Sequence, residues 1–314
     1  MTSRSSAPLN ALARVTCTCL ILVCAWAAGA GAQGRPAGPP VRLVLPPGGI
    51  SMPMQDFGGR PVVQVYVNGE PHFFIFDTGA QGSVIDSAAA AQAGLPVVGE
   101  QLVGSPGGDV ARVPLVRVDR LGVGGAEVAL SMPAVNLRAM ARGAPNAPSG
   151  VLSAALFGDN LLTLDYPARR VLVGPGSLGE PNGRDVLSVD LGARLPTVPV
   201  VVGDRTVVVH LDTGSPESLA LPLAYADSLP LQAPPVRGPT VRRIGGEIAT
   251  YTARLNGLMR LGPLTIENPE IRFLDVPAGT RGNVGQVLLS RMVITLDRAH
   301  GRVRLELPAT PSRP

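Results

Sequence analysis

The sequence predicts an all-β protein of two similar β-barrel-like lobes, related by an approximate twofold axis, with a cleft where the lobes meet. Gly (38) and Pro (32) are abundant and aromatic residues make up only 4%, which favours short strands and frequent turns. A chain of 314 residues that is 45% hydrophobic can form two separate cores. The pattern of the first half recurs in the second, which indicates a duplicated unit.

The first 32 residues have the features of a signal peptide. Arg4 and Arg14 supply positive charge, Val15 to Ala28 is an uncharged apolar stretch, and Ala30-Gly31-Ala32 is typical of a cleavage site. The apolar stretch is shorter than the roughly 20 residues of a membrane-spanning helix. We therefore expect cleavage after Ala32 and an exported protein, periplasmic or secreted, without a membrane anchor. An uncleaved anchor is the alternative.

All three cysteines (Cys17, Cys19 and Cys24) lie within this leader. The rest of the chain therefore has no disulfide, no thiol nucleophile and no cysteine metal site. Cys24 could accept a lipid, but Val23 before it is bulkier than the small residue that lipidation normally requires. We interpret the cysteines as small apolar residues of the leader.

The charge pattern does not favour binding to nucleic acid. The formal net charge is +4, and every basic residue is Arg. Without Arg4 and Arg14 the charge falls to about +2, and the remaining charges are interspersed rather than clustered. Aromatic side chains that could stack on bases are few.

Two stretches rich in Pro and Gly, Gln33 to Pro61 and Gly174 to Gly183, lack sustained periodicity and divide the chain. The last residues, Pro308 to Pro314, resemble a frayed tail. The predicted segments are the signal peptide (1–32), a linker or N-terminal edge segment (33–60), an N-terminal lobe (61–174), an inter-lobe linker (175–190), a C-terminal lobe (191–307) and a tail (308–314).

Each half of the chain contains two apolar strands, joined by a turn and followed by Asp-Thr-Gly. In both halves the turn begins nine residues before the Asp. The matching segments are Val62–Val67 and Val198–Val202, the turns Asn68-Gly69 and Gly203-Asp204, the strands His72–Phe76 and Val207–Leu211, and the tripeptides Asp77-Thr78-Gly79 and Asp212-Thr213-Gly214.

The match between the halves continues downstream, and several aligned features in one order indicate duplication rather than chance. Short helices are expected at Ser87 to Ala93 and, more weakly, at Pro222 to Ser228. The further pairs are Gly107-Gly108 with Gly245-Gly246, Arg120-Leu121-Gly122 with Arg260-Leu261-Gly262, and the block from Gly150 to Asp165 with the block from Gly282 to Asp297.

An Asp at the end of a buried apolar strand is costly unless it has a partner, because burial disfavours an isolated carboxylate. Asp77 and Asp212 both stand at such a place, and a twofold axis would bring them to one cleft. Two carboxyl groups about 3 Å apart cannot both ionise, so the pair would hold one proton. One carboxylate could then act as a general base on a water, while the neutral partner polarises a carbonyl and donates a proton.

With these motifs the chain resembles the pepsin/retropepsin clan of aspartic peptidases, particularly bacterial retropepsin-like proteins with two fused lobes. That clan is itself the standard example of a proton-sharing Asp pair. Asp-Thr-Gly-Ala at 77–80 is similar to the retroviral loop, and Asp-Thr-Gly-Ser at 212–215 is similar to either branch. The clan's apolar-apolar-Gly segment is matched loosely by Asn283-Val284-Gly285, and by Val151-Leu152-Ser153 with Ser in place of Gly. The resemblance covers roughly residues 60 to 307.

The resemblance implies an aspartic endopeptidase acting on peptide or protein substrates, with Asp77 and Asp212 as catalytic residues and with no cofactor or metal. Thr78 and Thr213 would hydrogen-bond across the lobes. The backbone would approach the carboxylates at Gly79 and Gly214, and Ala80 and Ser215 would complete the two loops. Flap hairpins are implied near Gly107, Gly108, Gly245 and Gly246, although this region lacks the Tyr of pepsin-like flaps.

A mildly acidic activity optimum is expected from the residues that follow the two tripeptides. A hydroxyl such as that of Ser215 can stabilise a carboxylate and lower the pKa of the pair, whereas Ala80 cannot. His72, His210 and His300 are scattered without ligand spacing, and a structural role for His210 is favoured over one in tuning the dyad.

A monomeric peptidase is not the only function compatible with these motifs. A duplicated fold of this kind could bind peptides or polymers without cutting them, since fold does not fix function. The two intact Asp-Thr-Gly loops favour the peptidase. An obligate homodimer is less favoured, because one chain already carries both loops. Neither a serine-hydrolase elbow nor a phosphate-binding βαβ unit is present. Subsite specificity and any inhibitory role of a pro-segment between Gln33 and Arg60 are not predicted.

Overall fold

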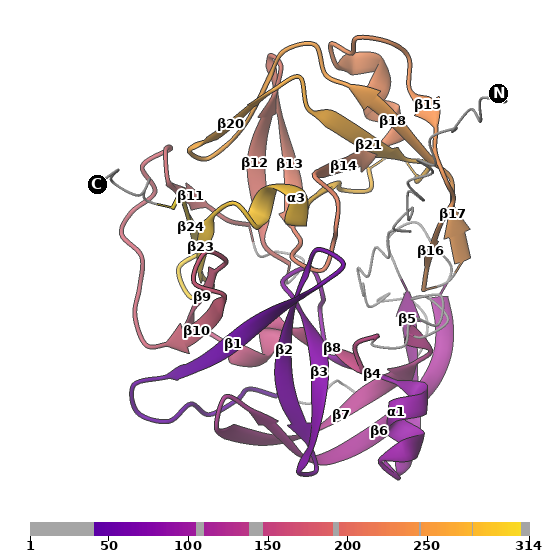
Figure 1. The fold of residues 1–314 in the computed structure, drawn as a ribbon, viewed down its shortest axis with the longest axis vertical. Helices are drawn as coiled ribbons and strands as arrows, with labels where there is room; N and C mark the ends of the chain where they lie inside the picture. The colour runs from indigo at the N-terminus through magenta and orange to yellow at the C-terminus, as the bar shows by residue number, and fades with distance from the viewer. Residues whose placement is uncertain are drawn as a thin grey trace, which may run out of the picture.

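The computed structural model describes residues 41–104, 110–137, 147–190, 195–244, 246–277 and 279–308. The predicted signal peptide therefore lies outside the described residues. The described chain is mostly strand, in two large sheets and one small one. Figure 1 shows one lobe, indigo to magenta, below a second lobe, salmon to orange. The prediction of an all-β protein with two lobes is confirmed.

The first lobe begins with a strand hairpin whose turn, at Asn68 and Gly69, has positive φ angles of 51° and 100°, as the predicted Asn-Gly turn requires. Its elements are β1 (Ile50–Phe57), β2 (Arg60–Val67), β3 (Glu70–Asp77), β4 (Val84–Asp86), α1 (Ser87–Gln92), β5 (Val97–Gly104), β6 (Val110–Val123), β7 (Ala126–Val135), β8 (Gly150–Ser153) and the 3-10 helix η1 (Ala154–Phe157). The strands pair in the order β1-β2-β3-β8-β4-β7-β6-β5, and an additional β2–β6 pairing closes the lobe.

The second lobe repeats this topology. Its elements are β12 (Thr197–Val202), β13 (Arg205–Leu211), β14 (Leu219–Pro222), the 3-10 helix η2 (Leu223–Ser228), β15 (Val236–Arg237), β16 (Val241–Arg243), β17 (Gly246–Ile248), β18 (Thr250–Arg254), β19 (Leu258–Leu261), β20 (Leu264–Glu267), β21 (Glu270–Leu274), β22 (Asn283–Val284) and α3 (Gln286–Leu289). The order β13-β22-β14-β21-β18 corresponds to β3-β8-β4-β7-β6. Each corresponding pair has the same sense, parallel or antiparallel.

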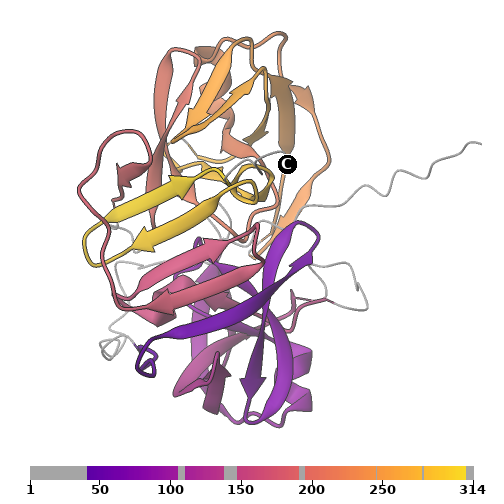
Figure 2. The same cartoon turned by 60° about the vertical axis from the view of Figure 1, so that its left-hand side comes forward.

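A six-stranded antiparallel sheet joins the lobes. It uses β9 (Leu161–Asp165), β10 (Arg170–Gly174), β11 (Val186–Ser188), β23 (Val293–Asp297) and β24 (Arg302–Glu306) together with β1, in the order β11-β24-β23-β9-β10-β1. Figure 2 shows the yellow and pink hairpins of this sheet side by side. Thr163 and Thr295 face each other at the middle of the β9–β23 pair, with their hydroxyl oxygens 3.1 Å apart. The pseudo-twofold axis therefore passes near these two threonines.

The segment predicted as a linker or N-terminal edge segment (33–60) and the predicted inter-lobe linker (175–190) both contain strands of this sheet. Within 33–60, the residues of β1 pair with β10 on one side and with β2 on the other. Within 175–190, the residues of β11 pair with β24. The two strands are equivalent under the pseudo-twofold axis, so these parts of the predicted linkers belong to the folded core of the molecule.

Candidate active site

Asp77 and Asp212 end equivalent strands of the two lobes. β3 runs parallel to β8, which sets Asp77 opposite Ser153, and β13 runs parallel to β22, which sets Leu211 opposite Val284. Phe76, just before the first Asp, stacks on Phe157 with ring centroids 5.6 Å apart. Both Asp side chains have no exposed surface. The strands therefore hold both carboxyl groups in the interior of the molecule.

Reciprocal hydrogen bonds between Thr78 and Thr213 tie the two Asp loops together. The backbone N–H of each Thr donates to the hydroxyl of the other, at 3.0 and 3.1 Å. Each hydroxyl then donates to a carbonyl of the opposite lobe, Thr78 to Leu211 at 2.5 Å and Thr213 to Phe76 at 2.8 Å. The lobes thus satisfy each other's buried polar groups, and these are the cross-lobe bonds that the family resemblance implied for the two threonines.

Gly79 and Gly214 let each loop approach the carboxyl group of the other lobe. A Cβ on Gly79 would lie 2.6 Å from Oδ1 of Asp212, and a Cβ on Gly214 would overlap Oδ2 of Asp77. Each Gly N–H also donates to the Asp of its own loop, at 2.7 Å for Asp77 and 3.0 Å for Asp212. Any side chain at these positions would push the two carboxyl groups apart.

Burial raises the pKa of both carboxyl groups. The pKa of Asp77 is raised well above its ordinary value, first by burial and then by the charge of Asp212. The pKa of Asp212 is raised to about 6 by burial, which outweighs hydrogen bonds from Asn283, Gly214 and Ser215. The two carboxyl groups lie close together, because Gly79 donates to Asp77 and lies against the carboxyl group of Asp212. The pair is therefore a coupled acid that retains one proton when either group alone would be ionised.

Several polar side chains that the sequence did not mark as functional support this pair. Arg60 is buried and its Nε donates to the carbonyl of Gly214 in the opposite lobe, at 2.8 Å. Gln286 donates from Nε2 to the carbonyl of Thr213 at 2.6 Å and to the hydroxyl of Tyr166 at 2.7 Å. Burial raises the pKa of that phenol, which keeps it neutral. One sequence feature could have indicated these residues. Each is a polar residue at a position that strand alternation, or the match between the two halves, predicts to face the interior.

Asn283 is the most direct of these supports. In the sequence it is only a loose match to the apolar-apolar-Gly motif. Its side chain is 4% exposed, and Nδ2 donates to Oδ2 of Asp212 at 2.9 Å. The residue therefore contacts the candidate catalytic pair itself.

Ser215 and Ser153 differ from expectation. The Ser215 hydroxyl accepts from the N–H of Glu217 at 3.4 Å, while its backbone N–H is the group that bonds Asp212. The hydroxyl of Ser153 donates to the carbonyl of Ala80 at 2.5 Å and accepts from Ala155 N–H at 3.1 Å. Ser153, which stands in place of the packing Gly of this motif, therefore bonds the backbone of the Asp77 loop.

The candidate flap residues are only partly described. Gly107, Gly108 and Gly245 lie outside the described residues, and Gly246 begins β17. β16 and β17 form a hairpin. Ile244 lies next to the turn of this hairpin and is only 5% exposed. Ile244 packs in an apolar cluster whose other buried members, including Ala80, come from the first lobe. This hairpin of the second lobe therefore reaches across to the first Asp loop.

The histidines take no part in the pair. His210 lies two residues before Asp212, and burial and Arg281 lower its pKa to about 4, so its ring is neutral near neutral pH. Burial lowers the pKa of His72. His300 bonds the buried Asp297 at 2.9 Å, far along the chain in the central sheet. Within the described ranges, no group of three or more His, Cys, Asp or Glu side chains could hold a metal ion.

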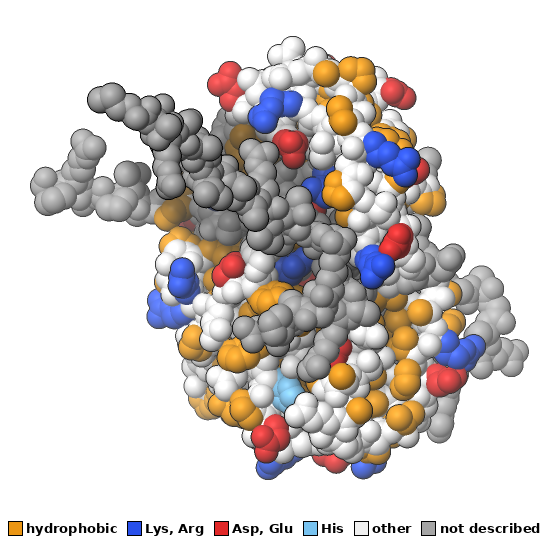
Figure 3. All heavy atoms as spheres, turned by 45° about the vertical axis from the view of Figure 1, so that its right-hand side comes forward, with side chains coloured by type: hydrophobic (Ala, Val, Ile, Leu, Met, Phe, Trp, Pro, Cys, Tyr) orange, Lys and Arg blue, Asp and Glu red, His pale blue; other side chains and the backbone are white. Residues whose placement is uncertain are grey.

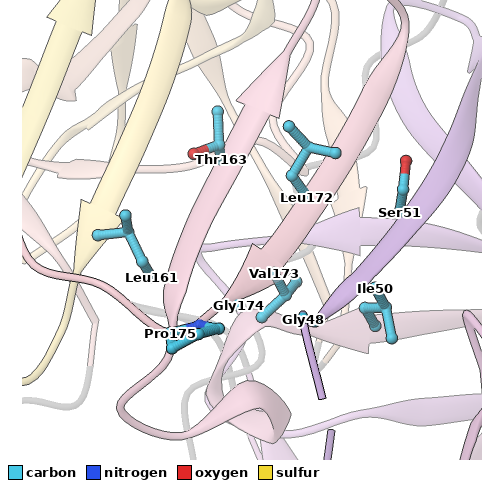
Figure 4. A pocket seen from close by; sticks show the side chains of 10 residues that line it. Gly48, Ile50, Ser51, Leu161, Thr163, Leu172, Val173, Gly174 and Pro175 are labelled. Atoms are coloured by element: carbon cyan, nitrogen blue, oxygen red, sulfur yellow. The ribbon is translucent and has the colours of Figure 1, made fainter. Parts of the chain in front are cut away.

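A shallow hollow lies on the central sheet rather than at the Asp pair. It is lined by residues such as Ser51, Leu161 and Thr163, and none of its lining side chains is ionisable (Figure 4). On the face in Figure 3, acidic and basic side chains are scattered among neutral ones. In the part of the chain that the structure describes, no helix has the length and apolar character needed to cross a membrane.

Comparison with known families follows the same division into two units. A family model described as Aspartyl protease matches residues 63–159 and 198–293, which is more than half of the chain. The chain therefore belongs to the aspartyl protease family, with its unit present twice. The predicted likeness to the pepsin/retropepsin clan is confirmed. No curated protein sequence matches the chain.

Proposed function

We propose that the protein is an exported aspartic endopeptidase whose catalytic dyad, Asp77 and Asp212, forms within one chain. The observation that carries the proposal is the meeting of two fully buried carboxyl groups, delivered by equivalent loops that contact each other. Burying two acids in contact is costly, so they are not expected in a core that has only a structural role. Family membership supports hydrolysis of peptide bonds as the reaction.

The mechanism follows from the shared proton. One ionised carboxylate takes a proton from a water held between the two Asp side chains, and the water oxygen attacks the peptide carbonyl. The protonated partner donates its proton to the carbonyl oxygen. The resulting tetrahedral species then breaks its C–N bond as the amine nitrogen takes up a proton from the dyad. The hydrogen bonds at Thr78 and Thr213 keep both acids in place throughout.

Access to the dyad requires movement, because neither carboxyl group is exposed in this structure. The β16–β17 hairpin is a candidate cover, since Ile244 packs against the first lobe next to the Asp77 loop. We expect a peptide to enter the cleft when this hairpin lifts.

The direct test is cleavage of a mixed peptide library by the purified protein between about pH 4 and 8, with and without pepstatin. Activity should rise through about pH 6, the upper end of the mildly acidic range, as Asp212 ionises. Asp77→Asn and Asp212→Asn should each lower kcat about a thousandfold or more, since neither can share a proton in the same way. Asp204→Asn, a change at an exposed turn, should leave kcat unaltered.

Survival of cleavage in either dyad variant would show that these are not the catalytic acids. If the intact protein cuts no peptide but retains some of them on a column, it is a peptide-binding protein instead. Export is tested separately by sequencing the N-terminus of the protein recovered outside the cytoplasm: Gln33 is expected first, and Met1 would exclude the predicted cleavage.

A further inference from the structure

The two halves differ at one position that touches the dyad. Val151 in β8 lies opposite Ile75, two residues before Asp77. Asn283 in β22 occupies the equivalent place, opposite His210 and two residues before Asp212. Val151 is fully buried in an apolar cluster, whereas the amide of Asn283 donates to Oδ2 of Asp212 at 2.9 Å. The repeat is therefore symmetric in its backbone but not in its hydrogen bonds to the two acids.

The donors around the two carboxyl groups make the asymmetry explicit. Oδ1 of Asp212 accepts from Gly214 N–H at 3.0 Å, and its Oδ2 accepts from Asn283. Oδ1 of Asp77 accepts from Gly79 N–H at 2.7 Å. Oδ2 of Asp77 is buried and has no hydrogen-bond partner of ordinary geometry among the described residues, although the nearby N–H of Gly214 weakly favours the Asp77 anion. An anion is disfavoured where a buried oxygen lacks a donor, while a protonated Oδ2 could itself donate to the neighbouring carboxylate of Asp212.

Resting on the proposed function, we propose that Asn283 is a positioning residue that makes Asp212 the ionised member of the dyad and leaves the shared proton on Oδ2 of Asp77. Asp212 is then the base that removes a proton from water as the new C–O bond forms. Asp77 gives its proton to the carbonyl oxygen. When the C–N bond breaks, the amine takes the proton held by Asp212, and the hydroxyl proton returns to Asp77, so the dyad is restored.

The other charged groups near the dyad do not account for this difference. The Tyr166 phenol has a raised pKa and stays neutral. Burial and Arg281 keep His210 neutral above about pH 4. Glu217 is paired with Arg272 at 2.8 Å, and the guanidinium of Arg60 donates to a backbone carbonyl. Between pH 5 and 8 we therefore assign the acid limb of the pH profile, where activity rises with pH, to ionisation of the dyad.

The test uses Asn283→Leu, which keeps a similar shape but removes the donor, and Asn283→Val, which copies the first lobe. Both should move the acid limb of the kcat profile upward by about one pH unit, because the Asp212 anion loses a charged hydrogen bond. The basic limb should stay, since Asp77 ionises beside an anionic Asp212 in either case. The exposed Asn256→Leu should alter neither limb.

A second readout separates this inference from the proposed function. In protein labelled with ¹³C at the Asp carboxyl carbons, the signals lost in Asp77→Asn and Asp212→Asn identify the two groups. Asp212 should ionise first in the wild type and at higher pH in Asn283→Leu, whether or not any peptide is cleaved. Suppose that the wild type cleaves peptides, but the pH profile of kcat and the carboxyl signals of Asp77 and Asp212 are unchanged in the folded Asn283→Leu and Asn283→Val variants. Asn283 is then only structural, and the inference fails. If nothing is cleaved while the carboxyl signals shift, the proposed function fails and the proton assignment holds.

Discussion

The hydroxyl groups of Thr78 and Thr213 each make two hydrogen bonds across the lobe boundary. Thr78→Val keeps the shape but leaves the Thr213 N–H and the Leu211 carbonyl buried without a partner. We expect a loss of about 2 to 4 kcal/mol in the free energy of unfolding, measured by denaturant titration. Thr163→Val is the matched control, because it removes one hydroxyl contact from the central sheet, and it should cost about 1 kcal/mol or less. Equal losses in the two variants would contradict the special role of the loop threonines.

At this scale the sequence predicted the residues that repeat and missed those that do not. Asp77, Asp212 and the two threonines were found because each stands at the same place in both halves. Asn283 could not be found in that way, since its partner in the repeat is Val151. Only the parallel register of β22 beside β13 brings its amide to Asp212, and that register is a tertiary feature.

At the scale of the elements, the β16–β17 hairpin packs on the first lobe through Ile244, and this contact can be tested separately from the rest of the fold. Ile244→Ala removes buried apolar surface on the first lobe, so the hairpin should lift more often while its own lobe stays folded. Amide hydrogen exchange in β16 and β17 should become about tenfold faster or more, with little change in Tm. Ile271→Ala, in the interior of β21, should instead lower Tm. A large fall in Tm with unchanged local exchange in Ile244→Ala would show that the hairpin does not open independently.

The sequence did not predict β1 and β11 as strands of a central sheet, and each omission has a physical reason. In β1 the apolar residues Ile50, Met52 and Met54 do alternate and are buried, but Pro53 and the surrounding glycines obscured the pattern. β11 has only three residues, too few for a period of two to be recognised. Both become strands because the neighbouring hairpins of the central sheet offer an edge to pair with.

For the whole molecule, the buried dyad makes stability depend on pH. The folded protein holds the proton of Asp212 up to about pH 6, whereas the unfolded chain releases it near 3.8. The folded state therefore binds more protons between these values, and stability falls as pH rises through them. Asp212→Asn should remove the part of the decline that Asp212 causes, on the order of 2 to 3 kcal/mol between about pH 4 and 6, while the part caused by the buried Asp77 remains. Tm measured across this range checks it, with Asp204→Asn as the control that should behave like the wild type. A decline that persists unchanged in Asp212→Asn would mean that other groups cause it.

The duplicated architecture assigns one acid to each half of a single polypeptide, and the central sheet fixes the halves against each other through Thr163 and Thr295. A retroviral-type dimer would instead assemble its pair from two chains. These arrangements differ in what happens when two inactive variants are combined, because a site made between chains can be rebuilt from complementary subunits.

The most direct measurement is therefore peptide cleavage by the wild type, by Asp77→Asn, by Asp212→Asn and by an equimolar mixture of the two variants after joint refolding. A dyad formed within one chain predicts cleavage by the wild type and none by either variant or their mixture. Recovery of activity in the mixture would place the two acids on different chains, and cleavage by either variant alone would remove the dyad from the mechanism.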